Sequence, residues 1–391
     1  MKKSEKWKAE IKFFVSLQTI MDYKQYTEDA VSLLKQLIAT PSVSRDEGAA
    51  VAVFTHFIEE WGLPYTLIGN NILVKEDIDD SKPTLLLNAH IDTVKPVSSW
   101  TRDPFAPTIE GDRLYGLGSN DCGGGLVSLL QAYRILRGGT TEHTTSTPRT
   151  TEQSTVRQGS ALPYNLVFLA SCEEEVSGEN GFRLALPELP KVDVAIVGEP
   201  TGLQPAIAEK GLMVIDGIAR GKSGHAAREE GVNAIYEALD DLMWLRDYKF
   251  KKNSPLLGAT KMTVTMVNSG TQHNVVPDEC RFVIDVRTNE YYQNEYLFAF
   301  LQKHMKKCEL KARSFRLASS HIPIGHPLVQ RAIKMGMYPF GSPTLSDQAL
   351  MPFPSFKLGP GESSRSHSAD EYICISEIAK AIETYVELIS L

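Results

Sequence analysis

Three consecutive glutamates, Glu173 to Glu175, follow an apolar run in the sequence "NLVFLASCEEEVSGENG". Adjacent carboxylates repel one another unless a positive charge lies among them. His90 and Asp92 in "NAHIDTV" follow a similar apolar run, and so does Glu199 in "VGEPTG". Imidazole and carboxylate groups together are typical ligands of zinc, cobalt or manganese. The pattern therefore favours a metal site rich in oxygen and nitrogen ligands.

Two of these motifs also have ordinary structural explanations. A histidine and an aspartate two residues apart can cap the end of a strand, or Asp92 can hold the second ring nitrogen of a metal-binding His90. Asp121, in "GLGSNDCGGG", can be a helix N-cap or a carboxylate whose two oxygens bridge two cations. Phosphate binding by this turn is a weaker alternative, because neither GxGxxG spacing nor a Walker lysine is present.

Two further residues complete the candidate set. Cys122 has no histidine beside it in the sequence, so we interpret it as a small buried residue rather than a reactive thiol. His367 lies in "GPGESSRSHSADEY", a loop before the last predicted helix. Alone, each motif is more often structural, whereas two histidines with several carboxylates indicate a metal centre.

The elements that must position these residues alternate between helix and strand from about residue 25 to 207. Apolar runs at 83–93, 165–171 and 193–200 have the pattern of buried parallel strands, and 49–62 has helical periodicity. Ligands collect beyond the carboxyl ends of such strands, so residues far apart in sequence meet at one crevice. The sequence therefore predicts an α/β catalytic domain.

Residues from about 210 to 318 follow a different order: strand, helix, strand, strand, helix, strand. This order is typical of a split βαβ, ferredoxin-like α+β module. We predict that 210–318 is inserted into a discontinuous catalytic domain formed by 21–209 and 319–391. The segment 138–161 contains 8 Thr and 3 Ser in 24 residues and is predicted to be a disordered surface insertion. Residues 1–20 are predicted to be an upstream extension.

Composition restricts the possible partners and compartment. The net charge of the 391 residues is -7 and the sequence has no dense Lys/Arg block, which argues against nucleic acid or an anionic membrane as the main partner. No apolar stretch approaches the length of a membrane span. The five cysteines form no CxxC pair, which indicates a reducing cytoplasm rather than a disulfide framework. We expect a cytoplasmic protein that acts on a small molecule.

Five blocks in this order resemble the M20 metallopeptidases, the co-catalytic zinc group that includes acetylornithine deacetylase, succinyl-diaminopimelate desuccinylase, aminoacylase and carboxypeptidase G. The blocks are "NAHIDTV", "GLGSNDCGGG", "CEEEVSGENG", "VGEPTG" and "GPGESSRSHSADEY". The resemblance covers the chain from about Tyr23 onward, except for the Thr-rich segment. It implies a zinc-exopeptidase-like catalytic domain with a mixed sheet flanked by helices. It also implies that 210–318 is a lid and dimerisation domain of a homodimer.

The resemblance assigns roles to the candidate residues. It implies two zinc ions, with cobalt or manganese as possible substitutes, that share one bridging carboxylate. Asp92 would orient His90, and Glu174 would be the general base, whereas Glu173 would be a non-ligating neighbour. Leu117, Cys122 and Gly123 depart from the family's usual "GRGAxDMKGG", but no ligand is lost. The implied ligands are Asp121 as the bridge, His90 and Glu199 at one ion, and Glu175 and His367 at the other.

The same resemblance implies substrate contacts in the inserted module. His225, in "ARGKSGHAAREEGVNAI", would reach the partner subunit's active site and stabilise the oxyanion. Asn274 and Arg287, in "GTQHNVVPDECRFVIDVR", would contact the substrate, and an arginine suits a bidentate grip on a carboxylate. The structural alternatives are a helix-flanking histidine and a surface ion pair.

The implied activity is hydrolysis of the amide bond of an N-acyl amino acid. The first expectation is deacylation of N-acetylornithine, or of an N-succinylornithine or citrulline substrate, in arginine biosynthesis. Succinyl-diaminopimelate desuccinylase of lysine biosynthesis is the next alternative, followed by a dipeptidase. A non-enzymatic binding role would be expected to lack a ligand or the base, and this sequence has all of them.

Overall fold

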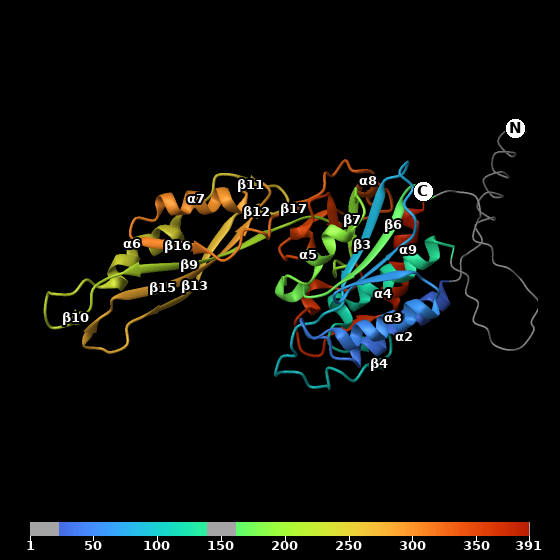
Figure 1. Cartoon of the computed structure of the whole chain (residues 1–391), viewed down its shortest axis with the longest axis horizontal. Helices are drawn as coiled ribbons and strands as arrows, with labels where there is room; N and C mark the ends of the chain where they lie inside the picture. The colour runs from blue at the N-terminus through green and yellow to red at the C-terminus, as the bar shows by residue number, and fades with distance from the viewer. Residues whose placement is uncertain (1–22, 139–161, 391) are drawn as a thin grey trace, which may run out of the picture.

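The computed structural model describes residues 23–138 and 162–390. The predicted extension 1–20 lies outside the described residues, as does the predicted insertion 138–161 apart from Gly138. Within the described part the chain forms two lobes (Figure 1). One lobe is built on a nine-stranded mixed sheet and the other on a four-stranded antiparallel sheet. This arrangement confirms the predicted fold class.

The large sheet supplies the strand ends on which the candidate site is built. Its order is β1-β2-β6-β3-β7-β19-β8-β17, with β18 also paired to β8. β3 runs parallel to β6 and β7, and β7 runs parallel to β19, whereas β1 and β2 pair antiparallel. Every residue of β3 and β6 is buried, as their continuous apolar runs predicted. The strands are β1 (Tyr65–Ile68), β2 (Asn71–Lys75), β3 (Thr84–His90), β6 (Asn165–Ser171), β7 (Val194–Val197), β8 (Ala206–Glu209), β17 (Ser320–His321), β18 (Phe340–Ser342) and β19 (Ser355–Lys357).

Helix α4 (Gly124–Leu136) is the central helix of this lobe, and it is buried along almost its whole length. Its first turn packs so closely on the end of β7 that a Cβ on Gly125 would collide with the Gly198 carbonyl oxygen. The glycine run before α4 thus allows two backbones to meet beside Glu199. The other elements are α2 (Lys24–Ile38), α3 (Gly48–Glu60), α5 (Phe182–Ala185), α8 (Pro327–Lys334), α9 (Ile375–Ile389) and a small sheet of β4 (Thr108–Glu110), β5 (Arg113–Tyr115) and β20 (Tyr372–Cys374).

The second lobe has the predicted order of strands and helices. Its sheet runs β13-β15-β9-β16 with antiparallel neighbours throughout. Alternate residues of β9 are buried, because only one face of the sheet packs on helices. The elements are β9 (Gly211–Arg220), α6 (Ala234–Asp247), β13 (Lys261–Ser269), β15 (Glu279–Thr288), α7 (Asn294–His304) and β16 (Cys308–Ala312), with the short pairs β10 (Gly224–His225) and β14 (Val275–Val276), and β11 (Asn253–Ser254) and β12 (Gly258–Ala259).

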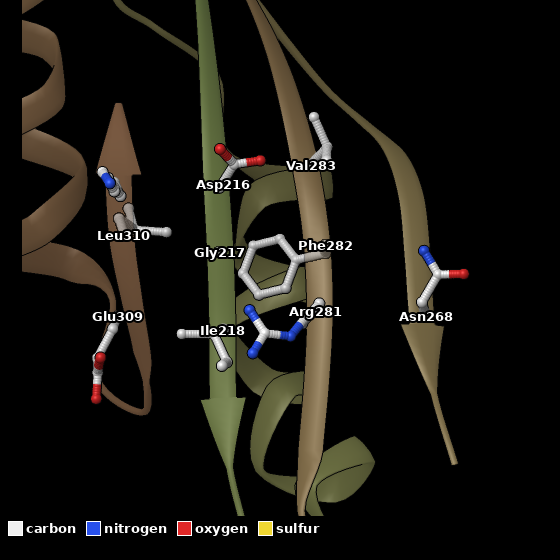
Figure 2. Close-up of a pocket in the computed structure, with 10 residues that line it drawn as sticks. Asp216, Gly217, Ile218, Asn268, Arg281, Phe282, Val283, Glu309 and Leu310 are labelled. Carbon is white, nitrogen blue, oxygen red and sulfur yellow. The ribbon is translucent and has the colours of Figure 1, made fainter. Parts of the chain in front are cut away.

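The strands of this second sheet line a shallow cavity of about 410 Å³. Figure 2 shows the side chains that line it, with the Phe282 ring lying over Gly217. None of the candidate metal ligands borders it, so it is separate from the candidate site. The lining residues are Asp216, Gly217, Ile218, Asn268, Arg281, Phe282, Val283, Glu309, Leu310 and Lys311.

Two stretches of chain connect the lobes, and they lie side by side. The outgoing chain passes from β8 to β9 through Lys210, and the returning chain follows β16. Ser320 of β17 pairs with Glu209 of β8, and the Ser319 hydroxyl donates to the Glu209 carbonyl oxygen at 2.7 Å. Among the described helices, none has the length and apolar character needed to cross a membrane.

Candidate metal centre

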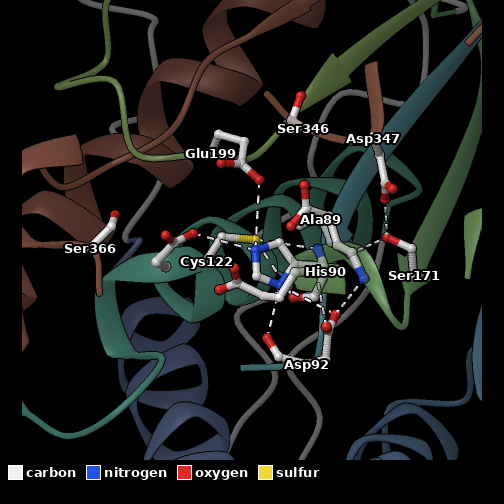
Figure 3. Close-up of polar contacts among 12 residues, drawn as sticks. Ala89, His90, Asp92, Cys122, Ser171, Glu199, Ser346, Asp347 and Ser366 are labelled. Atoms are coloured by element: carbon white, nitrogen blue, oxygen red, sulfur yellow. Dashed lines mark hydrogen bonds and ion pairs between the residues drawn. The ribbon is translucent and has the colours of Figure 1, made fainter. Parts of the chain in front are cut away.

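The candidate ligands meet because neighbouring parallel strands end at the same edge of the large sheet. His90, the last residue of β3, lies beside Ser171, the last residue of β6. Glu174 and Glu175 follow β6 in a short 3-10 turn, and Glu199 follows β7 by two residues. The strand register therefore brings the candidate histidine and glutamates together (Figure 3).

Asp121 lies between two groups of possible ligand atoms. His90 Nε2 is 3.3 Å from Asp121 Oδ1 and 3.6 Å from Glu199 Oε1. On the other side, His367 Nε2 is 3.5 Å from Asp121 Oδ2 and 2.9 Å from Glu175 Oε2. Each oxygen of Asp121 thus faces a different histidine. His90 and Glu199 form one set of possible ligands, and His367 and Glu175 form the other. Both sets share the Asp121 carboxylate.

The spacing and chemistry of these atoms fit divalent metal ions. Ligands bound at about 2.0–2.1 Å in a tetrahedral site lie about 3.3 Å from one another, which matches the observed separations. Glu199 Oε1 is buried and has no hydrogen-bond partner among the described residues. A buried carboxylate oxygen without a partner is unfavourable unless a cation neutralises it. The donor set therefore fits a pair of metal ions.

Hydrogen bonding orients His90 for this role. Its Nδ1 lies 2.8 Å from the main-chain carbonyl oxygen of Asp92 and 3.5 Å from the Asp92 carboxylate. Because a carbonyl oxygen only accepts, Nδ1 carries the proton and Nε2 keeps its lone pair for a ligand. The main-chain carbonyl makes the closer contact, and the carboxylate has other partners.

The Asp92 carboxylate holds the two glutamates that follow β6. It accepts hydrogen bonds from the backbone N–H groups of Glu174 and Glu175 at 3.1 and 3.2 Å, and from the Ser44 hydroxyl at 2.6 Å. Asp92 therefore sets the path of the acidic turn as well as contacting His90. The neighbouring Glu173 is buried and turns away from the ligands, where its carboxylate accepts the Asn180 side-chain amide at 2.8 Å.

Burial and neighbouring charges raise the pKa of two carboxylates and one histidine of the site. Burial, with the nearby charge of Asp121, raises the pKa of Glu199 to about 8. Burial, with the charges of Glu199 and Asp347, raises the pKa of Glu174 well above its ordinary value. A hydrogen bond to Glu175 raises the pKa of His367 to about 9. The metal-free site therefore holds protons that bound cations would replace.

Three residues near this site carried no signal in the sequence analysis. Glu371 accepts the backbone N–H groups of Asn120 and Asp121 at 2.8 and 2.9 Å and so fixes the turn that carries the shared carboxylate. Asp347 accepts from the Ser171 hydroxyl at 2.6 Å beside His90. Arg316, on the returning connection, donates to the Ser177 carbonyl oxygen of the acidic turn. Glu371 lies in the same motif as His367, but its contact with the turn of Asp121, like the contacts of Asp347 and Arg316, is recognisable only once the chain is folded.

The structure does not bring the three expected substrate contacts to the metal centre of the same chain. His225 and Asn274 lie together at the strand pair β10–β14, where the Ala226 N–H donates to the Asn274 carbonyl oxygen at 3.0 Å. Figure 1 places β10 at the end of the second lobe farthest from β3. The Arg287 guanidinium makes two hydrogen bonds to Asp285, at 2.8 and 3.1 Å.

Comparison with known proteins identifies the family. The profile of Peptidase family M20/M25/M40 matches residues 86–146, and that of the Peptidase dimerisation domain matches residues 207–312. The chain has the peptidase and dimerisation domains of the M20 family. These matches and the relatives below support a hydrolase that acts on amide bonds, similar to the M20 peptidases.

Individual relatives agree with this assignment over nearly the whole chain. The acetylornithine deacetylase of Proteus mirabilis (strain HI4320) is 28% identical over 92% of this chain and 95% of its own length. Aminopeptidase PepT of Bacillus cereus has a similar fold, with a TM-score of 0.73 at 19% identity over 93% of this chain and 98% of its own. The Bacillus subtilis YxeP protein, described as a dinuclear metal-binding peptidase of the M20 family, has a TM-score of 0.67 at 16% identity over 94% and 98% of the two chains.

The raised pKa values predict how the stability of the metal-free M20 protein depends on pH. Glu199 and His367 bind protons more tightly in the folded than in the unfolded state, so their contribution is present at low pH and is lost as pH rises through about 8 and about 9. We expect the Tm of metal-free protein to fall by several degrees between pH 6 and pH 9 in calorimetry. Saturating zinc should oppose this fall, because binding requires deprotonated ligands. In the Glu199→Gln variant the Tm should fall less between pH 6 and pH 9. A Tm that rises over this range would contradict the expectation.

Proposed function

We propose that the protein is a two-zinc deacylase that hydrolyses the amide bond of an N-acyl amino acid. The observation that supports this most directly is the sharing of Asp121 between two histidine–glutamate sets. Cobalt or manganese can substitute for zinc, because the ligands are imidazole and carboxylate groups. The proposed ligands are His90, Asp121, Glu175, Glu199 and His367.

Two bound divalent ions would polarise the amide carbonyl and make water nucleophilic at neutral pH. Glu174 is the proposed general base, because its carboxylate lies among the ligands while its backbone is held by Asp92. In its ionised form it takes the proton of the attacking water and returns it to the leaving amine. Asp92 and Ser44 keep the acidic turn in place during this exchange.

We further propose that the substrate site is completed by a second copy of the chain. His225 and Asn274 lie at the far end of the second lobe, so a histidine there is available to the metal centre of a partner subunit. Helix α6 exposes Ile235, Leu239 and Met243 at helical spacing, and the edge strand β13 exposes Met266 and Val267. An apolar helix face beside an unpaired strand edge suits a homodimer interface. In that assembly the Arg287 guanidinium would release the Asp285 carboxylate and bind a substrate carboxylate instead.

N-acetylornithine is the first proposed substrate, with N-succinylornithine and acylated citrulline next, in a cytoplasmic route to arginine. The name of the Proteus mirabilis relative supports this order over succinyl-diaminopimelate and dipeptides. We expect metal-reconstituted protein to hydrolyse at least one of N-acetylornithine, N-succinylornithine and N-acetylcitrulline, measured by release of the free amine. Turnover of N-succinyl-diaminopimelate alone would show that the proposed substrate class is wrong.

Adjacent glutamates offer a matched test of the general base. Glu174→Gln should keep both metal ions but lower kcat by about 10²–10⁴-fold, the range that general base catalysis supplies. Glu173→Gln should retain both metals and measurable turnover, because Glu173 binds Asn180 rather than a ligand. Metal content by atomic emission and steady-state kinetics check both variants. Loss of metal in Glu174→Gln would mean that this residue is a ligand and not the base.

Mixed dimers test whether His225 acts on the partner subunit. His225→Ala and Glu174→Gln should each be nearly inactive alone, because every active site then lacks one group. After unfolding and joint refolding at equal amounts, hybrid dimers contain one complete site, so we expect about a quarter of wild-type activity. Size-exclusion chromatography with light scattering confirms the dimer. If mixing restores no activity although hybrids form, His225 serves its own subunit or none.

A further inference from the structure

A buried ion pair lies beside the candidate metal centre, where the charges of Glu199 and Glu174 help to raise the pKa of its lysine. Lys357 ends β19 and Glu209 ends β8, and their side chains are 2% and 0% exposed. Lys357 Nζ is 3.1 Å from Glu209 Oε2 and donates to the carbonyl and hydroxyl oxygens of Thr344, both at 3.2 Å. An ammonium group has three N–H donors, so each has an acceptor.

This ion pair continues into the site through the segment 344–347. Glu209 Oε2 also accepts a hydrogen bond from the Ser346 hydroxyl at 2.8 Å. The next residue, Asp347, accepts from Ser171 at 2.6 Å, and Ser171 lies beside His90 in the strand register. Figure 3 shows the hydrogen bond between Asp347 and Ser171. A continuous chain of polar contacts thus runs from Lys357 to the end of β6.

The same pair is attached to both connections between the lobes. Glu209 precedes the outgoing connection by one residue, and its backbone carbonyl accepts the Ser319 hydroxyl of the returning connection. Glu209 also pairs with Ser320 and with Ser342, which precedes the 344–347 segment. Glu209 therefore has two sets of contacts: its backbone pairs with the returning connection and with Ser342, and its carboxylate binds Lys357 and Ser346.

Stability alone is a weak explanation for this pair. Removing an ammonium and a carboxylate from water is so unfavourable that apolar residues of similar volume are often equally stabilising. What apolar side chains do not supply is a set of directed hydrogen bonds that hold one loop in one position. Those bonds converge on Thr344 and Ser346, at the edge of the metal centre.

We propose that Lys357 is a positioning residue for hydrolysis. Through Glu209 and Thr344 it holds the segment 344–347 against the metal centre and keeps the two lobe connections in register with it. The expected effect on turnover rests on the proposed deacylase function, whereas the effect on the position of the segment does not.

The experiment compares Lys357→Met with the double variant Lys357→Met/Glu209→Gln. The single variant leaves a buried carboxylate unpaired and should lose Tm strongly, whereas the double variant should recover most of it. In the double variant we expect kcat to stay reduced about 10–100-fold, because small misplacements near reacting atoms lower rates to this extent. Hydrogen exchange over residues 342–350 should be faster than in the wild type, and metal content should be unchanged.

A second buried ion pair provides the control. Arg134 Nη1 lies 2.5 Å from Asp29 Oδ2 between α4 and α2, with side chains 7% and 11% exposed. Asp29→Asn/Arg134→Met should change Tm without changing kcat or the hydrogen exchange of residues 342–350.

The proposal is overturned if Lys357→Met/Glu209→Gln regains wild-type kcat and wild-type hydrogen exchange together with its Tm. If the wild type hydrolyses no substrate in the panel, the deacylase function is wrong, but the exchange comparison still decides whether Lys357 positions the segment.

Discussion

Electrostatic repulsion among buried carboxylates is the constraint on which the rest of this structure depends. Asp121, Glu174, Glu175 and Glu199 gather at one edge of the large sheet, where water is too scarce to screen their charges. In the metal-free chain burial, together with the charge of Asp121, raises the pKa of Glu199 to about 8. The arrangement is favourable only with positive charge among the carboxylates, and the two histidines orient ring nitrogens toward the same place.

The surrounding fold holds this unfavourable cluster together by backbone contacts rather than by salt bridges alone. Asp92 accepts two N–H groups of the acidic turn, and Glu371 accepts two from the turn that carries Asp121. Gly125 lets the first turn of α4 touch the backbone beside Glu199. Because packed backbone moves less than side chains, the ligand positions are set before any cation arrives.

The two lobes carry different parts of the candidate site. The large lobe carries every candidate ligand and the candidate base. The second lobe carries His225 and Asn274 at its far end, and Arg287 on β15 opposite Leu212, near the connections. The two connections between the lobes meet at Glu209, the residue that Lys357 binds. A change in the relative position of the lobes would therefore act first on the segment that contains Ser346 and Asp347.

The sequence by itself determined the elements and the kinds of side chain at their ends. Continuous apolar runs predicted the buried strands and helical periodicity predicted the helices, since each element must bury its own apolar residues. The motifs also singled out His90, Asp121 and the glutamates, because imidazole and carboxylate groups together are typical metal ligands. Tertiary structure alone decided which of them meet, since that depends on β3, β6 and β7 being neighbours in parallel register. It also decided the roles of Lys357, Glu209 and Glu371, because the partners of a single polar residue become evident only after distant segments pack together.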